Sequence, residues 1–411
     1  MRFLNRFVLC LFLMTTVAMA GFAQGTPSFV PAWLNDGSPL SDADVSSIVT
    51  NIGTQQANPD HILVVIHGLG NSREASTASY NELAPRLVSE FQKSRQKVAV
   101  VGIQWNSDVP MGLFTAEANY LDMVARARKV GHWPARQVLL QVQKQYPKAK
   151  INIYAHSLGC EVTAATLVPE LTYADDIPKS EAFQPTRDIY ANMVTLAGSD
   201  LDWDVWFKGN VNARETNRRT QLTWMTMSPY VGEADKDETL KLRRMVRGVA
   251  AGSALPRMTQ QQYDTLFKGR IMMFDNTEIP ADHAFTNYYN AARLANIVPA
   301  AVFVADPKQP KPKLFTELDE VFAMPDQVTA LTPFLDSAHL TTAVYALWRL
   351  EKINCGGSQH LSDETLENMA RLMVNKPSTV RSACKDSACK TMSQGQWPTE
   401  KQLIRAGAPN W

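Results

Sequence analysis

The stretch Ile151–Gly159, which reads Ile-Asn-Ile-Tyr-Ala-His-Ser-Leu-Gly, decides the fold that this sequence predicts. Its first residues are rich in β-branched and aromatic side chains, which is typical of a buried strand. A helical pattern begins at Leu158, so the chain is expected to turn sharply from strand to helix at Ser157. Such a turn lifts the serine above the end of a sheet and requires small neighbours, which Ala155 and Gly159 provide. The stretch therefore predicts a nucleophile elbow, with alanine at a position where glycine is usual.

The chemistry of such a serine depends on its surroundings, because a hydroxyl is a poor nucleophile until a base activates it. The backbone N–H of Leu158 would lie at the start of the helix, where it can stabilise an oxyanion. The loop His67–Ser72 follows another apolar run and is expected to supply a second N–H, that of Leu69. A match to Ala-x-Ser-x-Gly alone also fits an ordinary tight turn, but the strand–turn–helix context and this His-Gly loop favour catalysis. In this interpretation His67 positions the loop and His156 flanks the elbow.

Around the elbow, short apolar runs alternate with helical patterns from about residue 60 to residue 300. The predicted strands cover residues 62–66, 98–103, 151–154, 189–196, 222–227 and 270–274. The helical patterns cover residues 74–94, 114–145 with an interruption near Gly131 and Pro134, a segment that begins at 158, and 285–295. Strands separated by helical crossovers predict an α/β fold, with a mainly parallel sheet and helices on both faces.

The general base can be sought among the histidines, because serine hydrolases of this architecture carry serine, acid and histidine in that chain order. Three histidines follow Ser157, namely His283, His339 and His360. His283 lies in a polar loop after the predicted strand that ends at Phe274, which is where the base is expected. His339 lies in an apolar helical stretch typical of packed residues, and His360 lies in a loop rich in glycine and serine. We therefore predict His283 as the base.

Several segments together resemble a family of bacterial α/β-hydrolases whose function is poorly characterised. The shared features are the His-Gly loop, a strand that ends at Trp105, the stretch Tyr120-Leu121-Asp122 and the Ala-His-Ser-x-Gly elbow. The similar segments are residues 62–72, 98–105, 120–125, 151–162, 189–204 and 237–248. The resemblance spans about residues 60–295, excludes the C-terminal region, and implies the α/β-hydrolase fold and catalytic type without indicating a substrate.

The acid of the triad has two main candidates, Asp235 and Asp237, which both follow the predicted strand 222–227. Asp235 fits a general pattern in which a glycine, here Gly232, precedes the acid by three residues. Asp237 fits the pattern of the resembling family better, because it leads a segment that runs into a helix. Either aspartate could instead cap that helix. Asp202, after the preceding strand, is a further candidate; we predict Asp237, with Asp235 as the alternative.

The N-terminus has the pattern of a secretory signal peptide. Arg2 and Arg6 precede the apolar run Phe7–Val17, and small residues follow at Ala18-Met19-Ala20. The apolar run is short for a membrane span, although an uncleaved anchor helix is the alternative. We predict a signal peptide over residues 1–20, cleavage near Ala20 or Ala23, and export to the periplasm or the medium, with no transmembrane segment after cleavage.

The composition changes after residue 305, where Asp306–Lys313 carries three prolines and three lysines. This stretch predicts an exposed linker between a catalytic domain over 21–305 and a helical C-terminal region over 306–411. Helical patterns there cover 314–351 and 362–375, and the region is a candidate for binding a partner.

The cysteines of an exported protein can oxidise. The C-terminal region is therefore expected to hold a disulfide that joins Cys384 to Cys355 or Cys389. Cys160 is expected to be a small buried core residue.

The composition argues against several other classes of protein. The 411 residues include 41 basic and 40 acidic side chains, so no strong field of one sign would attract nucleic acid. Asp200–Asp204 does not begin a calcium loop, because Val205 and Val211 occupy the positions that need glycine and an acid. No spaced His/Cys cluster suggests zinc, and no stretch matches a P-loop. No metal or cofactor is therefore expected.

These observations predict hydrolysis of a carboxylic ester, a small molecule or a lipid, through an acyl-enzyme. Ser157 would attack, His283 would take its proton, an aspartate would orient the histidine, and Leu69 and Leu158 would hold the oxyanion. Amides and thioesters use the same machinery and stay open as substrates. The rival hypothesis is a non-catalytic binding protein on a hydrolase scaffold, which would lack a triad member.

Overall fold

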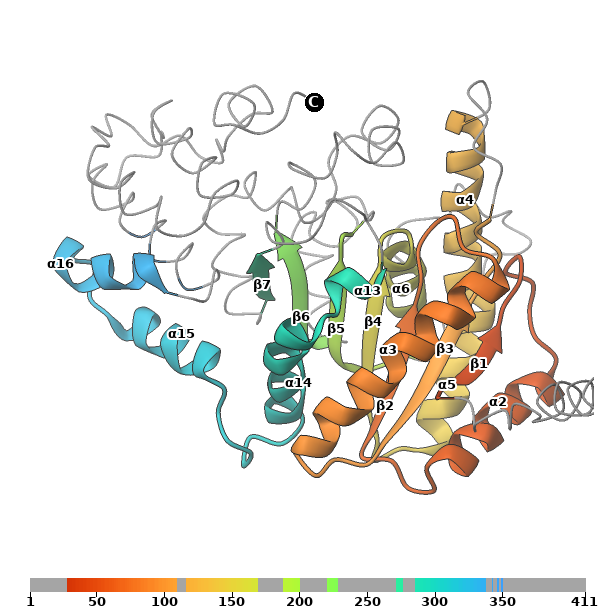
Figure 1. The fold of residues 1–411 in the computed structure, drawn as a ribbon, viewed down its shortest axis with the longest axis horizontal. Coiled ribbons are helices and arrows are strands. Elements are labelled where there is room, and N and C mark those ends of the chain that lie inside the picture. The colour runs from red at the N-terminus through yellow and green to blue at the C-terminus, as the bar shows by residue number, and fades with distance from the viewer. Residues whose placement is uncertain are drawn as a thin grey trace, which may run out of the picture.

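The computed structural model describes residues 28–108, 116–168, 188–199, 220–227, 271–275 and 285–337, together with Thr342, Ala346 and Arg349 (Figure 1). The predicted signal peptide and the cysteines 355, 384 and 389 lie outside these residues. The signal peptide and the disulfide therefore stay predictions. In the described part of the chain, no helix combines the length and the apolar character needed to span a membrane.

The core of the protein is a seven-stranded sheet in which every neighbouring pair of strands is parallel. The strand order is β1-β3-β2-β4-β5-β6-β7. The strands are β1 Val30–Trp33, β2 His61–Ile66, β3 Val98–Gln104, β4 Lys150–His156, β5 Ala191–Ala197, β6 Thr220–Met227 and β7 Ile271–Asp275. Continuous apolar runs such as that of β2 are buried along their whole length, because helices cover both faces. The predicted α/β fold is confirmed.

The structure adds one strand that the sequence patterns did not predict. β1 lies at the edge of the sheet and pairs with β3, so that Pro31 is in register with Gly102. Proline lacks the N–H of a sheet hydrogen bond and is tolerated on edge strands. A run of four residues with a proline therefore carries little strand signal until the neighbouring strand is in place.

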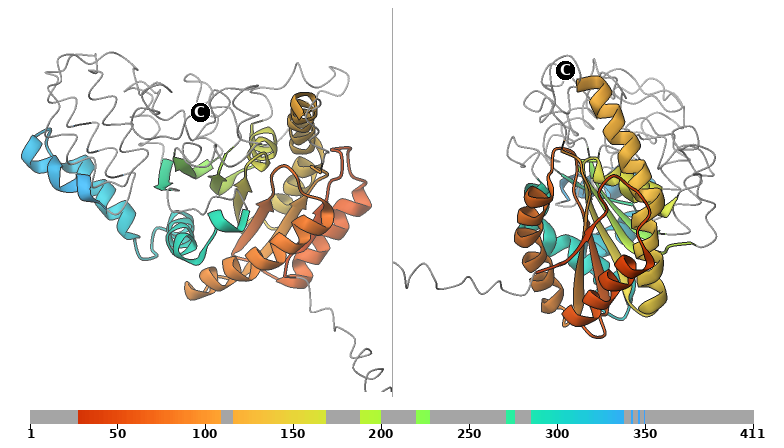
Figure 2. Two further views of the ribbon diagram at one scale, coloured as in Figure 1. Left: turned by 45° about the horizontal axis from the view of Figure 1, so that its top comes forward. Right: turned by 90° about the vertical axis from the view of Figure 1, so that its right-hand side faces the viewer.

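Helices pack on the two faces of the sheet in separate groups (Figure 2). One face carries α3 and α14, which contact each other; the other carries α4, α5 and α6, with α2 packed on α5. The helical segments are α2 Asp42–Gln55, α3 Arg73–Lys93, α4 Ala116–Val130, η1 Gly131–Ala135, α5 Arg136–Gln145, α6 Gly159–Leu167, α13 Phe285–Tyr288, α14 Ala291–Ala305, α15 Lys313–Ala323, α16 Val328–Leu331 and η4 Thr332–Asp336.

The interruption predicted near Gly131 and Pro134 is confirmed as a π-helical turn, η1, between α4 and α5. Proline cannot donate the backbone hydrogen bond of a regular helix, which favours such a local widening. Gly131 also faces α6 closely, since a β-carbon there would lie 2.4 Å from the carbonyl oxygen of Val162. The turn therefore lets this long helical unit lie directly against the helix that follows Ser157.

The helix predicted over residues 285–295 is instead two helices. α13 ends at Tyr288 and α14 begins at Ala291. Asn290 caps α14, because its side-chain oxygen accepts a hydrogen bond of 3.1 Å from the N–H of Arg293. Asparagine favours this capping conformation over a helix interior, which explains the break.

The C-terminal helices begin with α15, which packs on α14. The rings of Phe303 and Phe315 lie 5.2 Å apart, and the apolar face of α15 is buried in the same hydrophobic core. The single helical stretch predicted over 314–351 is wrong, since α15 ends where Met324 adopts an extended conformation before Pro325. A residue before proline disfavours the helical region. The domain boundary at residue 306 stays a prediction.

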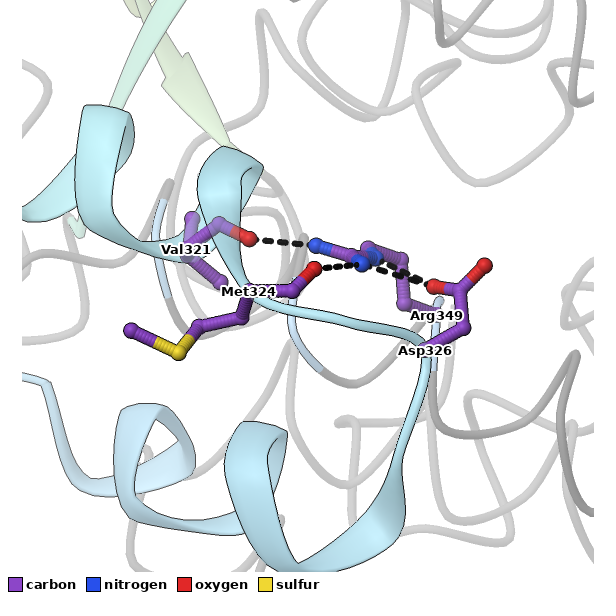
Figure 3. A network of polar contacts seen from close by, with 4 residues as sticks. All are labelled: Val321, Met324, Asp326 and Arg349. Carbon is purple, nitrogen blue, oxygen red and sulfur yellow. Dashed lines mark hydrogen bonds and ion pairs between the residues drawn. The ribbon is translucent and has the colours of Figure 1, made fainter.

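Arg349 closes the C-terminal end of α15 (Figure 3). Its guanidinium donates to the carbonyl oxygens of Val321 and Met324, and it forms an ion pair with Asp326 at 2.7 Å. Carbonyls at a helix end lack partners within the helix, so a buried cation that binds them stabilises this end. A residue of a later helix thereby ties that helix to α15.

Candidate active site

Ser157 lies at a sharp turn between β4 and α6. Its φ is +50°, a conformation that side chains other than glycine rarely adopt. Two backbone hydrogen bonds hold it there: the Ser157 N–H donates to the carbonyl oxygen of Ala197 on β5, and its own carbonyl accepts from the N–H of Cys160, both at 3.0 Å. The strand, the strained residue and the helix thus form an elbow at the carboxyl end of the sheet.

Two glycines allow other segments to approach this elbow. A β-carbon on Gly159 would lie 2.6 Å from the carbonyl oxygens of Ile66 and His67, so α6 begins in direct contact with the end of β2. A β-carbon on Gly68 would lie 2.6 Å from the β-carbon of Ser157 and 3.1 Å from its hydroxyl oxygen. The loop after β2 therefore touches the serine, and any side chain at residue 68 would enter the space of the hydroxyl.

Ala155 occupies the remaining small position of the elbow. It is fully buried in β4, and its carbonyl oxygen accepts a hydrogen bond of 2.8 Å from the hydroxyl of Tyr289. This tyrosine comes from the segment between α13 and α14, so the two helices after β7 are fastened to the strand that carries the serine.

The two predicted oxyanion donors near Ser157 are the backbone amides of Leu69 and Leu158. Within the described part of the chain, no hydrogen bond uses the N–H of Leu69 or of Leu158. Leu158 directly precedes α6, where the partial positive charge of a helix N-terminus favours an anion. Among the described residues, no acceptor therefore binds the two N–H groups that an oxyanion would need.

The rest of the loop His67–Ser72 is tightly bonded. The N–H of His67 donates to the hydroxyl of Tyr80 at 2.8 Å, and the N–H groups of Gly70 and Asn71 donate to the carbonyl oxygen and the hydroxyl of Ser107. Ser72 caps α3 by accepting from the N–H of Ala75. The amide of Leu69 is thus held inside a rigid loop.

His67 is buried and its ring nitrogens are both engaged. Nε2 accepts the N–H of Trp105 at 3.1 Å, so in the neutral ring Nδ1 carries the proton and donates to the carbonyl oxygen of Gly68 at 2.8 Å. Burial lowers the pKa of His67 to about 4. His67 is therefore neutral at neutral pH, lies parallel to the indole of Trp105, and has no nitrogen left to serve as a base.

His156 precedes the serine and is enclosed by α13. Its ring lies 5.3 Å from that of Phe285 and 4.9 Å from that of Tyr288. These contacts bring the start of α13 next to the elbow. Phe285, which packs on the histidine that precedes Ser157, is the second residue after the predicted base His283 in the sequence.

The other predicted site residues lie outside the described part of the chain. These are the base candidates and the acid candidates: His283, His339, His360, Asp202, Asp235 and Asp237. β6 and β7, after which Asp237 and His283 come, run parallel to β4, so their carboxyl ends face the same edge of the sheet as the elbow. The Asp200–Asp204 stretch also lies outside; among the described residues no cluster of three or more potential ligands could hold a metal ion.

Sequence reasoning missed two residues that shape this site, Ser107 and Tyr80. Ser107 follows β3 at the carboxyl edge of the sheet, a placement that polar residues of active sites share, and that signal was available. Tyr80 lies in the middle of α3 and joins the N–H of His67 to the carbonyl oxygen of Ile103. Nothing in its helical spacing indicates this bridge.

Comparison with protein families matches residues 44–305 to a family described as an alpha/beta hydrolase of unknown function (DUF900). The match covers more than half of the 411 residues. No curated protein and no solved structure is significantly similar to the chain. The matched residues contain strands β2 to β7 of the parallel sheet, the elbow and the His-Gly loop. The chain therefore belongs to this DUF900 family of α/β hydrolases.

Proposed function

We propose that the protein is a serine hydrolase that cleaves a carboxylic ester of a small molecule or a lipid through an acyl-enzyme. The observation that carries the proposal is the left-handed conformation of Ser157, buried at the turn from β4 to α6. Strained residues of this kind persist where the surrounding structure enforces them, and they are concentrated at functional sites. The amides of Leu69 and Leu158, which have no hydrogen-bond partner among the described residues, would supply the electrostatic complement that acyl transfer requires.

The proposed base is His283 and the proposed acid is Asp237, with Asp235 as the alternative. The support for His283 is the contact between the rings of Phe285 and His156, which returns the chain to the elbow directly after residue 283. The hydroxyl bond from Tyr289 to the carbonyl of Ala155 holds the same segment in place. His67 has both ring nitrogens engaged and His156 packs on Phe285 and Tyr288, so we propose neither of them as the base.

The proposed reaction proceeds in two steps. His283 takes the proton of the Ser157 hydroxyl as its oxygen bonds to the ester carbonyl carbon, and the amides of Leu69 and Leu158 bind the resulting oxyanion. The bond to the alcohol then breaks, and His283 donates the proton to the leaving oxygen. The same histidine then takes a proton from a water molecule as the water oxygen bonds to the acyl carbon, and it returns that proton to the Ser157 oxygen as the acid is released.

A fluorophosphonate probe on the purified full-length protein tests the nucleophile. Wild type is expected to be labelled at Ser157, and folded Ser157→Ala is expected to lose both labelling and ester turnover. Ser47→Ala, which removes an exposed hydroxyl of α2, is the matched control and should label normally. A folded wild type that resists the probe would favour the binding-protein hypothesis, and labelling of Ser157→Ala would place the nucleophile at another residue.

The bond that is cleaved needs a separate test. An ester, a thioester and an amide of the same acyl group, offered to wild type and to Ser157→Ala, compare the leaving groups directly. We expect Ser157-dependent turnover to be fastest for the oxygen ester. Faster Ser157-dependent turnover of the amide or thioester would keep the serine mechanism and change the substrate class.

We also propose that the mature enzyme acts outside the cytoplasm after loss of residues 1–20. The support is the N-terminal pattern of Arg2, Arg6 and the apolar run that follows. Mass spectrometry of periplasmic or secreted protein should find a new terminus just after Ala20 or Ala23. Exported protein that still begins at Met1 would contradict cleavage.

A further inference from the structure

The carbonyl oxygen of Gly68 accepts an unusual number of hydrogen bonds. The imidazole Nδ1–H of His67 and the hydroxyl of Ser107 each donate to it at 2.8 Å, and the side-chain amide of Asn71, whose shorter bond of 3.0 Å is to the carbonyl of Leu69, approaches it at 3.4 Å. Ser107 and His67 are almost completely shielded from solvent. A single backbone oxygen is thus fixed by groups from two separate loops, one after β2 and one after β3.

The fixed oxygen belongs to the peptide whose nitrogen is that of Leu69. No cis peptide bond occurs in the described chain, so this peptide is trans and planar. In a trans peptide the carbonyl oxygen and the amide hydrogen point in opposite directions. Donors that hold the oxygen of Gly68 therefore also set the direction of the Leu69 N–H, and they need not touch that N–H.

Gly68, the first residue of this peptide, lies against the predicted nucleophile Ser157. The position of a β-carbon on Gly68 lies 3.1 Å from the hydroxyl oxygen of Ser157, whereas all three donors bind the peptide at its carbonyl. The N–H of Leu69 has no partner among the described residues. The contacts on the carbonyl side thus leave the opposite side of the peptide, with its N–H, for a ligand.

Without such contacts this peptide would be mobile, because Gly68 and Gly70 flank Leu69 and glycine permits many backbone conformations. A rotated peptide would present its carbonyl oxygen in place of its N–H, which repels an oxyanion. Donors of an oxyanion hole are effective because they are already oriented before charge develops. A loop with two glycines needs an external constraint to meet that condition.

We propose that Ser107 is a positioning residue for the oxyanion hole, acting with His67 and Asn71 through the carbonyl of Gly68. The proposal rests on the proposed serine hydrolase function. Ser107 is its centre, because its hydroxyl also accepts the N–H of Asn71 at 3.1 Å and its carbonyl accepts the N–H of Gly70 at 2.9 Å. Ser107, which lies outside the His-Gly loop, thereby binds the loop both before and after Leu69.

The variant Ser107→Ala tests this role, with Ser76→Ala as the matched control. Ser76 is equally buried, and its hydroxyl donates to the carbonyl of Arg73 and accepts from the side-chain amide of Gln104, two hydrogen bonds against three at the Ser107 hydroxyl, with no partner among His67–Ser72. Loss of an oxyanion donor typically lowers kcat by about 100- to 1000-fold, so loosening one of its several supports is expected to lower kcat about tenfold. We expect KM to change less than about twofold, because the ground state depends less on these donors.

A second measurement separates positioning from stability. A trifluoromethyl ketone forms a tetrahedral oxyanion with the serine. Its inhibition constant should therefore rise in Ser107→Ala by the same factor as kcat/KM falls. Ser76→Ala should keep wild-type kcat and inhibition whatever its thermal stability. If Ser107→Ala does not fold, Asn71→Ala, at a half-buried site, should show the same pattern to a smaller degree.

The outcomes distinguish this proposal from the function on which it rests. If wild type itself is neither labelled by a fluorophosphonate nor active, the proposed function fails. If wild type is labelled at Ser157 while Ser107→Ala keeps wild-type kcat and inhibition, the function stands and the positioning role is wrong. Equal losses in Ser107→Ala and Ser76→Ala would also refute positioning, since they would indicate a general effect on stability.

Discussion

Replacing Gly68 by alanine is the sharpest test of the elbow geometry. The added β-carbon would lie 2.6 Å from the β-carbon of Ser157 and 3.1 Å from its hydroxyl oxygen. Carbon atoms in contact prefer separations of about 3.5–4.0 Å, so one of the two segments must move by about 1 Å. Because both segments are bonded to the sheet, neither can move as a whole. The shift is therefore expected to be local, at Ser157 or at the peptide that follows Gly68.

The expected cost appears in two measurements. Overpacking a tight site typically destabilises a protein by about 1–3 kcal/mol, and we expect a loss of that size in chemical denaturation. A displacement of about 1 Å between reacting groups typically lowers turnover about 100-fold, and we expect a decrease of that order in kcat of the folded variant. The rate of fluorophosphonate labelling should decrease in parallel.

Gly70→Asn provides the control in the same loop. Gly70 has a φ of +75°, but a β-carbon there would meet nothing within 4 Å. Asparagine tolerates this conformation better than other residues, so the variant should keep turnover within a few-fold of wild type. The reasoning is refuted if folded Gly68→Ala keeps near-normal turnover, or if both variants lose activity equally.

Two further predictions concern stability at low pH and the acid of the triad. Burial lowers the pKa of His61 and of His67 to about 4 from 6.5, so between those values the unfolded chain binds more protons and stability falls as pH falls. Protonation of each histidine in the unfolded chain should lower the free energy of unfolding by about 2 kcal/mol between pH 7 and pH 4.5. The free energy of unfolding of His61→Gln should therefore fall less over this range than that of wild type. A free energy of unfolding that does not change with pH in chemical denaturation would contradict the burial argument. Asp237→Asn should lower turnover about 10,000-fold at unchanged foldedness, as expected for a misoriented histidine, whereas Asp235→Asn should cost about 1 kcal/mol of stability at most. Near-normal turnover of Asp237→Asn would assign the acid to another residue.

Much of the architecture could be predicted from the sequence because it depends on local patterns. The run Ile62–Ile66 is buried along its length and uniformly apolar, and the strand before Ser157 carries isoleucine and tyrosine that favour a strand, so both are easily recognised. The break at Gly131 and Pro134 was predictable because proline has a fixed effect on a helix. By contrast, β1 contains Pro31 and needs β3 to define it, and the break at Asn290 depends on a cap rather than on hydrophobic spacing.

The candidate site shows the same difference between residues set by local patterns and residues set by long-range contacts. The elbow and Leu158 follow from one continuous stretch, so sequence reasoning reached them. Ser107 and Tyr80 act through contacts between loops and helices that only the folded sheet brings together. Asp235 and Asp237 are two residues apart and follow the same strand, so no local pattern decides which of them would face a histidine.

The left-handed backbone at Ser157 means that the active protein is not the most stable form that its fold allows. A side chain in this region costs about 1–2 kcal/mol relative to conformations that suit it, and glycine would be free of most of that cost. Selection for heat resistance alone would therefore favour replacement of the serine, whereas selection for turnover would retain it. In a directed-evolution experiment without an activity screen, inactive survivors with glycine at this position are expected to accumulate.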